Sequence, residues 1–443
     1  MPVFLFPRRK HRRYTIILHT GNHEDVIQTA GVSREKISRI HEYLAGFHDP
    51  SGRPALLEVS SGPQGVRRYT GEFWTSRQRQ ASALHEISYR ACFKPQLPRF
   101  FIDLLTQAGD VVYDPFSGRG TTAIEAGLRG RQVIANDANP LSRIITEPRF
   151  FPPAEAEVAA RLETIPRDGD RADRDLSMFY HPDTEREIVA LRRYLLLKKE
   201  DGTADAIDRW IGMVATNRLT GHSSGFFSVY TLPPNQAVSQ KSQERINRKR
   251  GQVPEYRDTH MLILRKTKNL VAGLTPAEKS DLNRAGAGAR FFTGDARATP
   301  GIASNAVQLT VTSPPFLDIV QYREDNWLRC WFCGLDGDTI GHTMTMARTV
   351  AEWEAVMGAV FRELFRITAP EGCVAFEVGE VRKKTVRLEE QVVPLGLAAG
   401  FTCEGVLINE QVFSKTSNIW GIGNNESGTN TNRIVVFKKL LKS

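Results

Sequence analysis

One stretch of the chain has residue types and spacing suited to binding a nucleotide-like cofactor. Residues 111–122 have the sequence Val-Val-Tyr-Asp-Pro-Phe-Ser-Gly-Arg-Gly-Thr-Thr, an apolar run followed by an acid, a glycine turn and a helix start. A strand ending at Asp114 would bring its carboxylate to the sheet edge where ligands bind in open α/β folds. Gly118 and Gly120 let the backbone turn tightly against a ligand, and we expect Thr121 or Thr122 to cap the following helix.

A second acid lies at the spacing expected of a ribose-binding residue. The run 132–136 predicts a strand, and Asp137 follows it, 23 positions after Asp114. Rossmann-like units place an acid at about this separation, at the end of their second strand, where it binds ribose hydroxyls. Asp295 ends a further predicted strand over 290–295. Together these acids favour a cofactor that contains a nucleoside.

The segment Ser313-Pro314-Pro315-Phe316 follows a predicted buried strand over 307–312. Consecutive prolines hold the backbone extended and carry no amide hydrogens, so the segment offers acceptors. The Ser313 hydroxyl and the Pro314 carbonyl can accept hydrogen bonds from an exocyclic amino group while Phe316 stacks on the base. Taken alone, a double proline before an aromatic also fits an ordinary loop.

Together, the two motifs resemble those of the SAM-dependent amino-methyltransferases of DNA. The cofactor motif of that family has the form Asp-Pro-Phe-x-Gly-x-Gly-Thr, and its catalytic motif is Ser/Asp/Asn-Pro-Pro-Tyr/Phe. The resemblance covers the core of the chain and implies a Rossmann-like seven-stranded α/β core, with S-adenosyl-L-methionine as cofactor. It also implies direct methyl transfer to the exocyclic amine of a base flipped out of DNA.

The resemblance assigns roles to individual positions. It implies that the methionine part of SAM lies among Asp114, Phe116, Gly118, Gly120 and Thr121, the ribose at Asp137 and the adenine near Asp295. The segment 93–97 resembles the upstream motif that covers the methionine end, although its Lys94 departs from the pattern. The expected cofactor residues of this segment are Phe93 and Pro95, and the expected catalytic residues are Ser313, Pro314, Pro315 and Phe316.

The target base follows from the first residue of the catalytic motif. Serine at that position is typical of enzymes that methylate N4 of cytosine, whereas aspartate or asparagine is typical of adenine N6. We therefore expect N4-cytosine methylation, and adenine stays open because the correlation has exceptions. Methylation at carbon 5 needs a cysteine nucleophile, usually after proline, and the chain has no Pro-Cys pair.

Other functions stay open at this stage. An RNA or protein methyltransferase could share the core, and a non-catalytic DNA-binding protein is an alternative of a different class. A dehydrogenase is disfavoured, because Gly118-x-Gly120 lacks the third glycine of a dinucleotide loop.

Seven strands and one long insertion account for the remainder of the pattern. Beyond the strands above, apolar runs predict strands over 373–378, 401–408 and 433–437, with a hairpin-like final pair. The alternation of predicted strands and helices stops between 148 and 288, where apolar residues recur at helical spacing. We expect four parts: an N-terminal basic module (1–75), the core with the cofactor motifs (76–148), a helical and basic insertion that is the candidate target-recognition region (149–288), and the core with the catalytic motif (289–443).

Basic residues point to an anionic partner. The net charge is +9 and the isoelectric point about 9.3, which favours nucleic acid. Residues 8–13 form a basic cluster, 26–40 resemble a helix-turn-helix or an ordinary helical hairpin, and 49–65 are rich in linker residues. The run 241–268 suits DNA phosphates or a solvated helix face. The expected DNA-binding residues there are Lys241, Arg245, Arg248, Lys249 and Arg250.

Cysteine usage and hydropathy indicate the compartment. Five scattered cysteines fit a reducing environment, and we expect neither a signal peptide nor a membrane span. With these features, the resemblance implies a prokaryotic, cytoplasmic, nucleoid-associated protein that acts on DNA and for which a cognate restriction endonuclease is a candidate partner. The sequence leaves the oligomeric state open.

Overall fold

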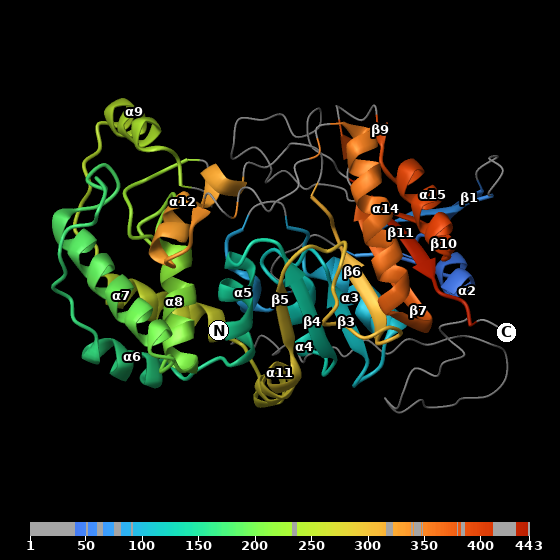
Figure 1. Cartoon of the computed structure of the whole chain (residues 1–443), viewed down its shortest axis with the longest axis horizontal. Coiled ribbons are helices and arrows are strands. Elements are labelled where there is room, and N and C mark those ends of the chain that lie inside the picture. Colours follow the sequence, from blue (N-terminus) through green and yellow to red (C-terminus); the bar gives the residue numbers. More distant parts are fainter. Residues whose placement is uncertain are drawn as a thin grey trace, which may run out of the picture.

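The computed structural model describes the part of the chain that contains both motifs (Figure 1). The described residues are 40–49, 52–59, 65–74, 81–89, 92–232, 237–315, 322–337, 340, 347, 349–378, 380–381, 386–410 and 431–441. The basic cluster 8–13 and the possible helix-turn-helix 26–40 lie outside them, apart from Ile40, which begins helix α2 (Ile40–Ala45).

A nine-stranded sheet organises the fold, with strand order β1-β2-β10-β11-β7-β6-β3-β4-β5. The strands β3 to β7 are parallel to one another where they pair, and β11 runs antiparallel to both β7 and β10. The bounds are β1 Leu56–Val59, β2 Arg67–Gly71, β3 Val111–Asp114, β4 Gln132–Asp137, β5 Arg290–Thr293, β6 Val307–Thr312, β7 Thr368–Val378, β10 Thr402–Glu410 and β11 Thr431–Lys438. A separate hairpin joins β8 (Glu380–Val381) to β9 (Val386–Arg387). All seven predicted strands are present, and the final pair is the antiparallel hairpin that the sequence predicted.

The described part of the N-terminal segment differs from the separate module that we expected. Strand β2 pairs in parallel with β10, in the register Val406↔Arg68, and β1 pairs with β2 from within the predicted linker 49–65. Tyr69 of β2 is almost fully buried against the sheet. This strand covers the edge that β10 would otherwise expose, and an uncovered edge is unfavourable.

Two helical layers cover the sheet because alternate residues of each strand point to opposite faces. Val112 belongs to one hydrophobic cluster and Tyr113 to the other. The Tyr113 face packs against α14 (Val350–Ile367) and α15 (Glu389–Ala399). The Val112 face packs against α3 (Gln96–Leu105), the 3-10 turn η2 (Ala83–His85) and α4 (Thr121–Gly127), and the chain continues after β4 through α5 (Leu141–Thr146) and η3 (Glu147–Phe150).

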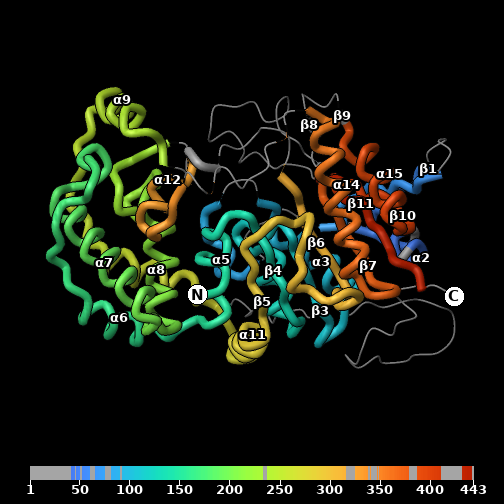
Figure 2. The backbone as a smooth tube through the Cα atoms, viewed as in Figure 1, coloured from blue at the N-terminus to red at the C-terminus, as the bar shows by residue number. Residues whose placement is uncertain are grey.

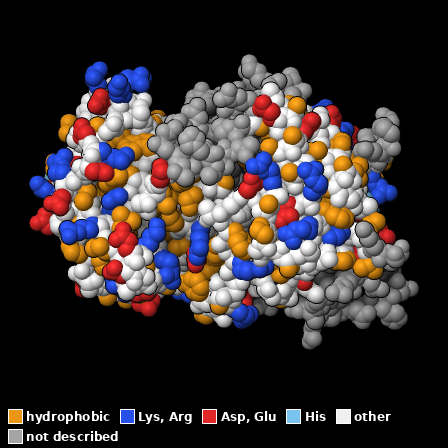
Figure 3. Space-filling model, in the orientation of Figure 1, with side chains coloured by type: hydrophobic (Ala, Val, Ile, Leu, Met, Phe, Trp, Pro, Cys, Tyr) orange, Lys and Arg blue, Asp and Glu red, His pale blue; other side chains and the backbone are white. Residues whose placement is uncertain are grey.

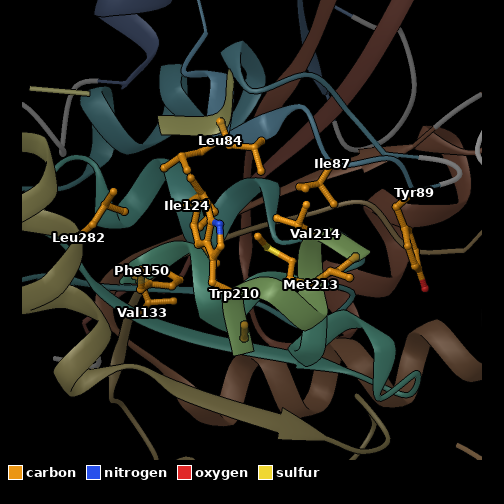
Figure 4. Close-up of a cluster of buried hydrophobic side chains, with 14 of the residues drawn as sticks. Leu84, Ile87, Tyr89, Ile124, Val133, Phe150, Trp210, Met213, Val214 and Leu282 are labelled. Atoms are coloured by element: carbon orange, nitrogen blue, oxygen red, sulfur yellow. The ribbon is translucent and has the colours of Figure 1, made fainter. Parts of the chain in front are cut away.

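The insertion between β4 and β5 is helical and shares this core. It consists of α6 (Glu155–Thr164), α7 (Pro182–Glu200), α8 (Ala206–Arg218), α9 (Gln240–Arg250), α10 (Thr259–Val271) and α11 (Pro276–Gly288), and α12 (Tyr322–Phe332) lies beside it (Figure 2). Figure 4 shows Trp210 and Val214 of α8 packed with Ile87 and Ile124. The Trp210 indole also donates to Thr267 of α10 at 3.0 Å. The insertion is therefore fixed to the sheet by burial.

Candidate active site

The two sequence motifs meet where the strand order reverses. Strands β3 and β6 are neighbours, and the chain continues from them to opposite sides of the sheet, to β4 and to β7. Such a switch point is where open α/β sheets bind ligands. At its carboxyl edge the Thr312 hydroxyl donates to the Asp114 carboxylate at 2.6 Å. One hydrogen bond thus joins the glycine loop after β3 to the Ser-Pro-Pro segment after β6.

Asp114 is buried to an unusual degree for an acid. Its side chain is 1% exposed, and it accepts a hydrogen bond from the Phe116 amide at 3.1 Å. Burial raises the pKa of Asp114 to about 7, although hydrogen bonds from the Thr312 hydroxyl and the Phe116 amide act in the opposite direction. The carboxylate therefore changes charge close to neutral pH.

The glycine loop has the backbone that the sequence predicted. Gly118 and Gly120 have φ values of 51° and 73°, in the left-handed region that favours glycine. A Cβ atom on Gly120 would lie 2.2 Å from the Thr146 methyl group, so the loop also needs glycine for space. The expected threonine cap is wrong: Gly120 is itself the N-cap, and the Thr122 hydroxyl instead donates to the Val311 carbonyl at 3.0 Å. Thr121 is buried and its hydroxyl accepts from Arg119.

Asp137 lies directly beside this loop. Its two carboxylate oxygens accept the amides of Gly118 at 2.7 Å and Asn139 at 2.8 Å. Burial raises the pKa of Asp137 to about 6, and these two amide bonds partly offset the effect. Since a carboxylate has about four acceptor positions, Asp137 can still accept two hydroxyl hydrogens, as a ribose diol requires. The free acceptor positions of Asp137 therefore fit the hydroxyl groups of a nucleoside cofactor.

Arginine contacts hold the upstream segment over the glycine loop. The Arg119 guanidinium donates to the carbonyls of Phe93 and His85, and the Cys92 sulfur lies 3.5 Å from the Cβ position of Gly118. Pro95 is buried at the N-cap of α3. Phe93 and Pro95 therefore lie beside the loop, whereas Lys94 is exposed.

Phe116 and Asp295 occupy the periphery of the site. Phe116 is partly buried and packs on the Tyr113 face of the sheet. Asp295 follows β5, which pairs with β4 in the register Asp137↔Thr293, so it lies along the same edge as Asp137. It is exposed and forms an ion pair with Arg297, which lowers the pKa of Asp295.

The Ser-Pro-Pro segment is described through Pro315, and Phe316 lies outside the described residues. The Pro315 carbonyl accepts the indole N–H of Trp353 at 3.0 Å. The Ser313 hydroxyl hydrogen-bonds to Glu377, which is 8% exposed. The Asn432 amide donates to the same carboxylate at 2.6 Å. Burial raises the pKa of Glu377 to about 6.

Sequence reasoning missed Glu377. A signal was present, because the glutamate interrupts an otherwise apolar run over the predicted strand 373–378. A buried, titratable carboxylate joined to a candidate catalytic hydroxyl has the properties of a proton acceptor. The arrangement can bind an amino group at Ser313 and Pro314 and receive a proton at Glu377.

The basic residues expected to contact DNA lie on α9. Lys241, Arg245, Arg248, Lys249 and Arg250 are all found there, away from the buried core. Gln243 and Asn247 anchor one face of the helix through the carbonyls of Tyr230 and Met178, and Arg250 stacks on the Tyr230 ring at 3.8 Å on that same face. Figure 3 shows the basic side chains gathered at this corner of the molecule, and Figure 1 places α9 on the side to which β7 and the β8–β9 hairpin extend. The basic face therefore stands on the same side as the carboxyl edge of the sheet.

Among the described residues, no group of three or more side chains could hold a metal ion. In the same part of the chain, no helix is long and apolar enough to cross a membrane.

Comparison with known proteins associates the cofactor half of the chain with DNA methylation. The model of a family described as "DNA methylase" matches residues 22–145. The type II methyltransferase M.MvaI of Kocuria varians is 30% identical over 96 residues, which cover 21% of this chain and 20% of that protein. The type II methyltransferase M.MjaII of Methanocaldococcus jannaschii is 33% identical over 73 residues, 16% of this chain and 14% of that one. The matched segments thus span a fifth or less of these curated relatives.

Two of the solved structures with similar portions are described as methylases or methyltransferases. A DNA modification methylase of Thermus thermophilus aligns at 22% identity with a TM-score of 0.22, covering 34% of this chain and 52% of that one. A SAM-dependent methyltransferase of Methanosarcina mazei aligns at 10% identity with a TM-score of 0.30, covering 77% and 98%.

Proposed function

We propose that the chain methylates the N4 amino group of cytosine in DNA, with S-adenosyl-L-methionine as the donor, and the match of residues 22–145 to the DNA methylase family model supports this proposal. The observation that carries the proposal is the hydrogen bond from Thr312 to Asp114, because it couples a cofactor loop to an amine-accepting segment. N6-adenine methylation is the alternative on the same geometry.

The glycine loop and its acids form the cofactor end of the proposed pocket. Asp137 binds the ribose hydroxyls with the acceptor positions that Gly118 and Asn139 leave open. Asp114 and Gly120 lie where β3 delivers the loop, beside the Ser-Pro-Pro segment. When bound, SAM supplies an electrophilic methyl group on a positively charged sulfur.

The Ser-Pro-Pro segment and Glu377 form the substrate end. The target amino group donates hydrogen bonds to the Pro314 carbonyl and the Ser313 hydroxyl, which leaves the nitrogen lone pair to attack the methyl carbon. Transfer of the methyl group to this nitrogen would leave the nitrogen positively charged. The nitrogen then loses a proton, which Glu377 accepts through the Ser313 hydroxyl.

The pocket requires the base to leave the helical stack, because its amino group is paired within a duplex. The basic face of α9 supports a DNA substrate. The insertion 149–288 supplies the target recognition in this proposal. A restriction endonuclease of the same sequence specificity, in a prokaryotic cytoplasm, is the partner that the proposal implies.

The decisive experiment is incubation of the full chain with DNA and labelled SAM, followed by mass spectrometry of the nucleosides. The expected product is N4-methylcytosine. Detection of N6-methyladenine in its place would favour the alternative, N6-adenine methylation. The Ser313→Ala variant should lose most of the activity. Absence of a methylated nucleoside from both DNA and RNA would refute catalysis.

Binding of the cofactor is tested separately by thermal unfolding. SAM should raise the melting temperature and NAD should not, since ligands that bind only the folded state stabilise it. No shift with SAM would contradict the assignment of the cofactor end.

A further inference from the structure

A group of cations lies behind an exposed loop that connects the insertion helices. The loop, residues 222–225, follows α8 and has the sequence His-Ser-Ser-Gly, and its first three residues are exposed. Four cations from three helices lie near one another behind it, and two of them, Arg218 and Arg265, lie beside Gly225 of the loop. We call them the cation cluster, and its members are Arg218 of α8, Arg265 and Lys266 of α10, and Arg329 of α12.

Two of these guanidinium groups flank Gly225. A Cβ atom at Gly225 would lie 3.6 Å from a terminal nitrogen of Arg265 and 4.0 Å from one of Arg218, with the Ser223 hydroxyl 3.5 Å away. The two arginine nitrogens are therefore within about 8 Å of each other. The exposed Arg265 guanidinium and the buried Arg218 guanidinium therefore both lie beside Gly225, and charged donors of this kind bind phosphate oxygens.

Neutral groups accept most of the hydrogen bonds that these cations donate. Arg218 donates to the backbone and side chain of Asn217 and stacks on Phe226 at 4.0 Å. Arg265 donates to the Ser224 carbonyl, and Arg329 donates to the Asn326 side chain.

Two carboxylates offset part of the charge of the cluster. Glu86 forms an ion pair with Lys266 at 3.3 Å, and the charge of Asp325 acts on Arg329. Burial, followed by the charges of Arg329 and Arg265, lowers the pKa of Arg218 to about 10. Burial and Arg218 lower the pKa of Lys266 to about 8. Buried charges are costly unless they are paired, so an anion at this place would relieve both repulsion and desolvation.

The cluster lies close to the candidate active site. The Tyr89 ring is 3.6 Å from the Cβ position of Gly118, and its hydroxyl accepts from Asn139. Burial lowers the pKa of Arg329, and Tyr89 lies close enough to this arginine to act in the opposite direction; the Asn217 amide donates to the Ser88 carbonyl. Residues 86–89 therefore have the cofactor loop on one side and the cation cluster on the other.

We propose that the cation cluster and the loop 222–225 bind a phosphodiester of the DNA strand that carries the target base, next to the flipped nucleotide. That this is the DNA strand with the target base rests on the proposed function. The bound phosphodiester would anchor this strand beside the pocket, in addition to the outer DNA contacts of α9. Phosphate contacts fix the position of the strand and carry no sequence information, so the site would be used at any recognition sequence.

The test uses two substitutions with matched controls in the full-length protein. Arg265→Gln removes an exposed guanidinium, and Lys268→Gln removes an exposed charge one turn further along α10. Gly225→Ala fills the space between the guanidinium groups, and Gly288→Ala adds a methyl group in open space. Neither glycine has a positive φ, so the backbone tolerates alanine at both places.

Binding of a fluorescent duplex is measured by anisotropy at several salt concentrations. Arg265→Gln and Gly225→Ala should weaken binding by roughly three- to tenfold, and the salt slope should fall by about one for the lost phosphate contact. Both controls should match wild type, and thermal stabilisation by SAM should be unchanged in all four variants. Wild-type affinity and slope in Arg265→Gln and Gly225→Ala would overturn the inference.

A neutral methylphosphonate beside the target base identifies the phosphate. It should weaken binding by wild type and have no further effect on Arg265→Gln, because both changes remove the same contact. Additive effects would overturn the assignment to that phosphate. Failure of wild type to methylate DNA would refute the proposed function, whereas the anisotropy comparison would still decide whether the cluster binds a phosphodiester.

Discussion

The carboxylate that joins the two motifs should reduce the stability of the protein at neutral pH. Asp114 is 1% exposed, and burial raises its pKa from 3.8 to about 7. A carboxyl group whose pKa is raised by folding contributes stability below its unfolded pKa, and this contribution is lost as the pH rises through the folded value. We therefore expect Asp114→Asn to be more stable than wild type in alkaline solution without SAM.

The magnitude follows from the pKa shift. Each unit corresponds to about 1.4 kcal/mol, so full ionisation of Asp114 costs about 4 kcal/mol of unfolding free energy. About half of this cost develops between about pH 5.5 and about pH 8.5. The amide carbonyl of the Asp114→Asn variant can still accept from Thr312 and the Phe116 amide, because both donate to the same oxygen of Asp114.

The assay is urea unfolding of both proteins at these two pH values. The stability difference between Asp114→Asn and wild type should grow by about 2 kcal/mol from the lower to the higher pH. Asp201→Asn, which removes an exposed carboxylate at the end of α7, serves as the control and should show no such growth. A pH-independent difference for Asp114→Asn would refute the argument that burial controls this group.

Three further predictions concern the loop, the proton acceptor and the DNA face. Gly120→Ala should lower the unfolding free energy by about 2 kcal/mol, because Gly120 has a positive φ and its Cβ position is in contact with Thr146. The same change should weaken SAM binding, measured by calorimetry. The control Gly273→Ala, also at positive φ but in open space, should leave SAM binding intact. Glu377→Gln should reduce methylation and abolish the rise in rate with pH near 6 that ionisation of Glu377 produces in wild type; an unchanged pH profile would exclude it as the proton acceptor. Charge reversal on α9 should weaken DNA binding and flatten its salt dependence in the anisotropy assay, while SAM binding stays unaffected. Unchanged DNA affinity would identify an ordinary solvated helix face. The positions to change are Lys241, Arg245, Arg248, Lys249 and Arg250.

The local sequence determined the strands and the two motifs. Short runs of β-branched and aromatic residues bounded by glycine, proline or acids are strong strand signals, and all seven core strands were predicted on that basis. The glycines at 118 and 120 were predictable because a tight turn after Asp114 has few alternatives. The resemblance to DNA amino-methyltransferases also depended on residues adjacent in the chain.

Tertiary structure decided the contacts between distant residues. The bond from Thr312 to Asp114 spans 198 positions, and the place of Glu377 beside Ser313 depends on the pairing of β6 with β7. Packing also overrode the local preference of threonine for helix N-caps, because the Thr122 hydroxyl donates to the Val311 carbonyl of β6 and does not cap α4.

The local sequence also did not predict how the N-terminal segment joins the sheet or that the cation cluster exists. Strand β2 joins the sheet because β10 offers an open edge, and β1 pairs with β2 from within 49–65, where a linker-like composition does not reveal a strand. The cluster is assembled from α8, α10 and α12, and periodicity within each helix gives no information about its neighbours. The sequence thus determined which chemical groups are present, and the packing of sheet and insertion determined which of them act together.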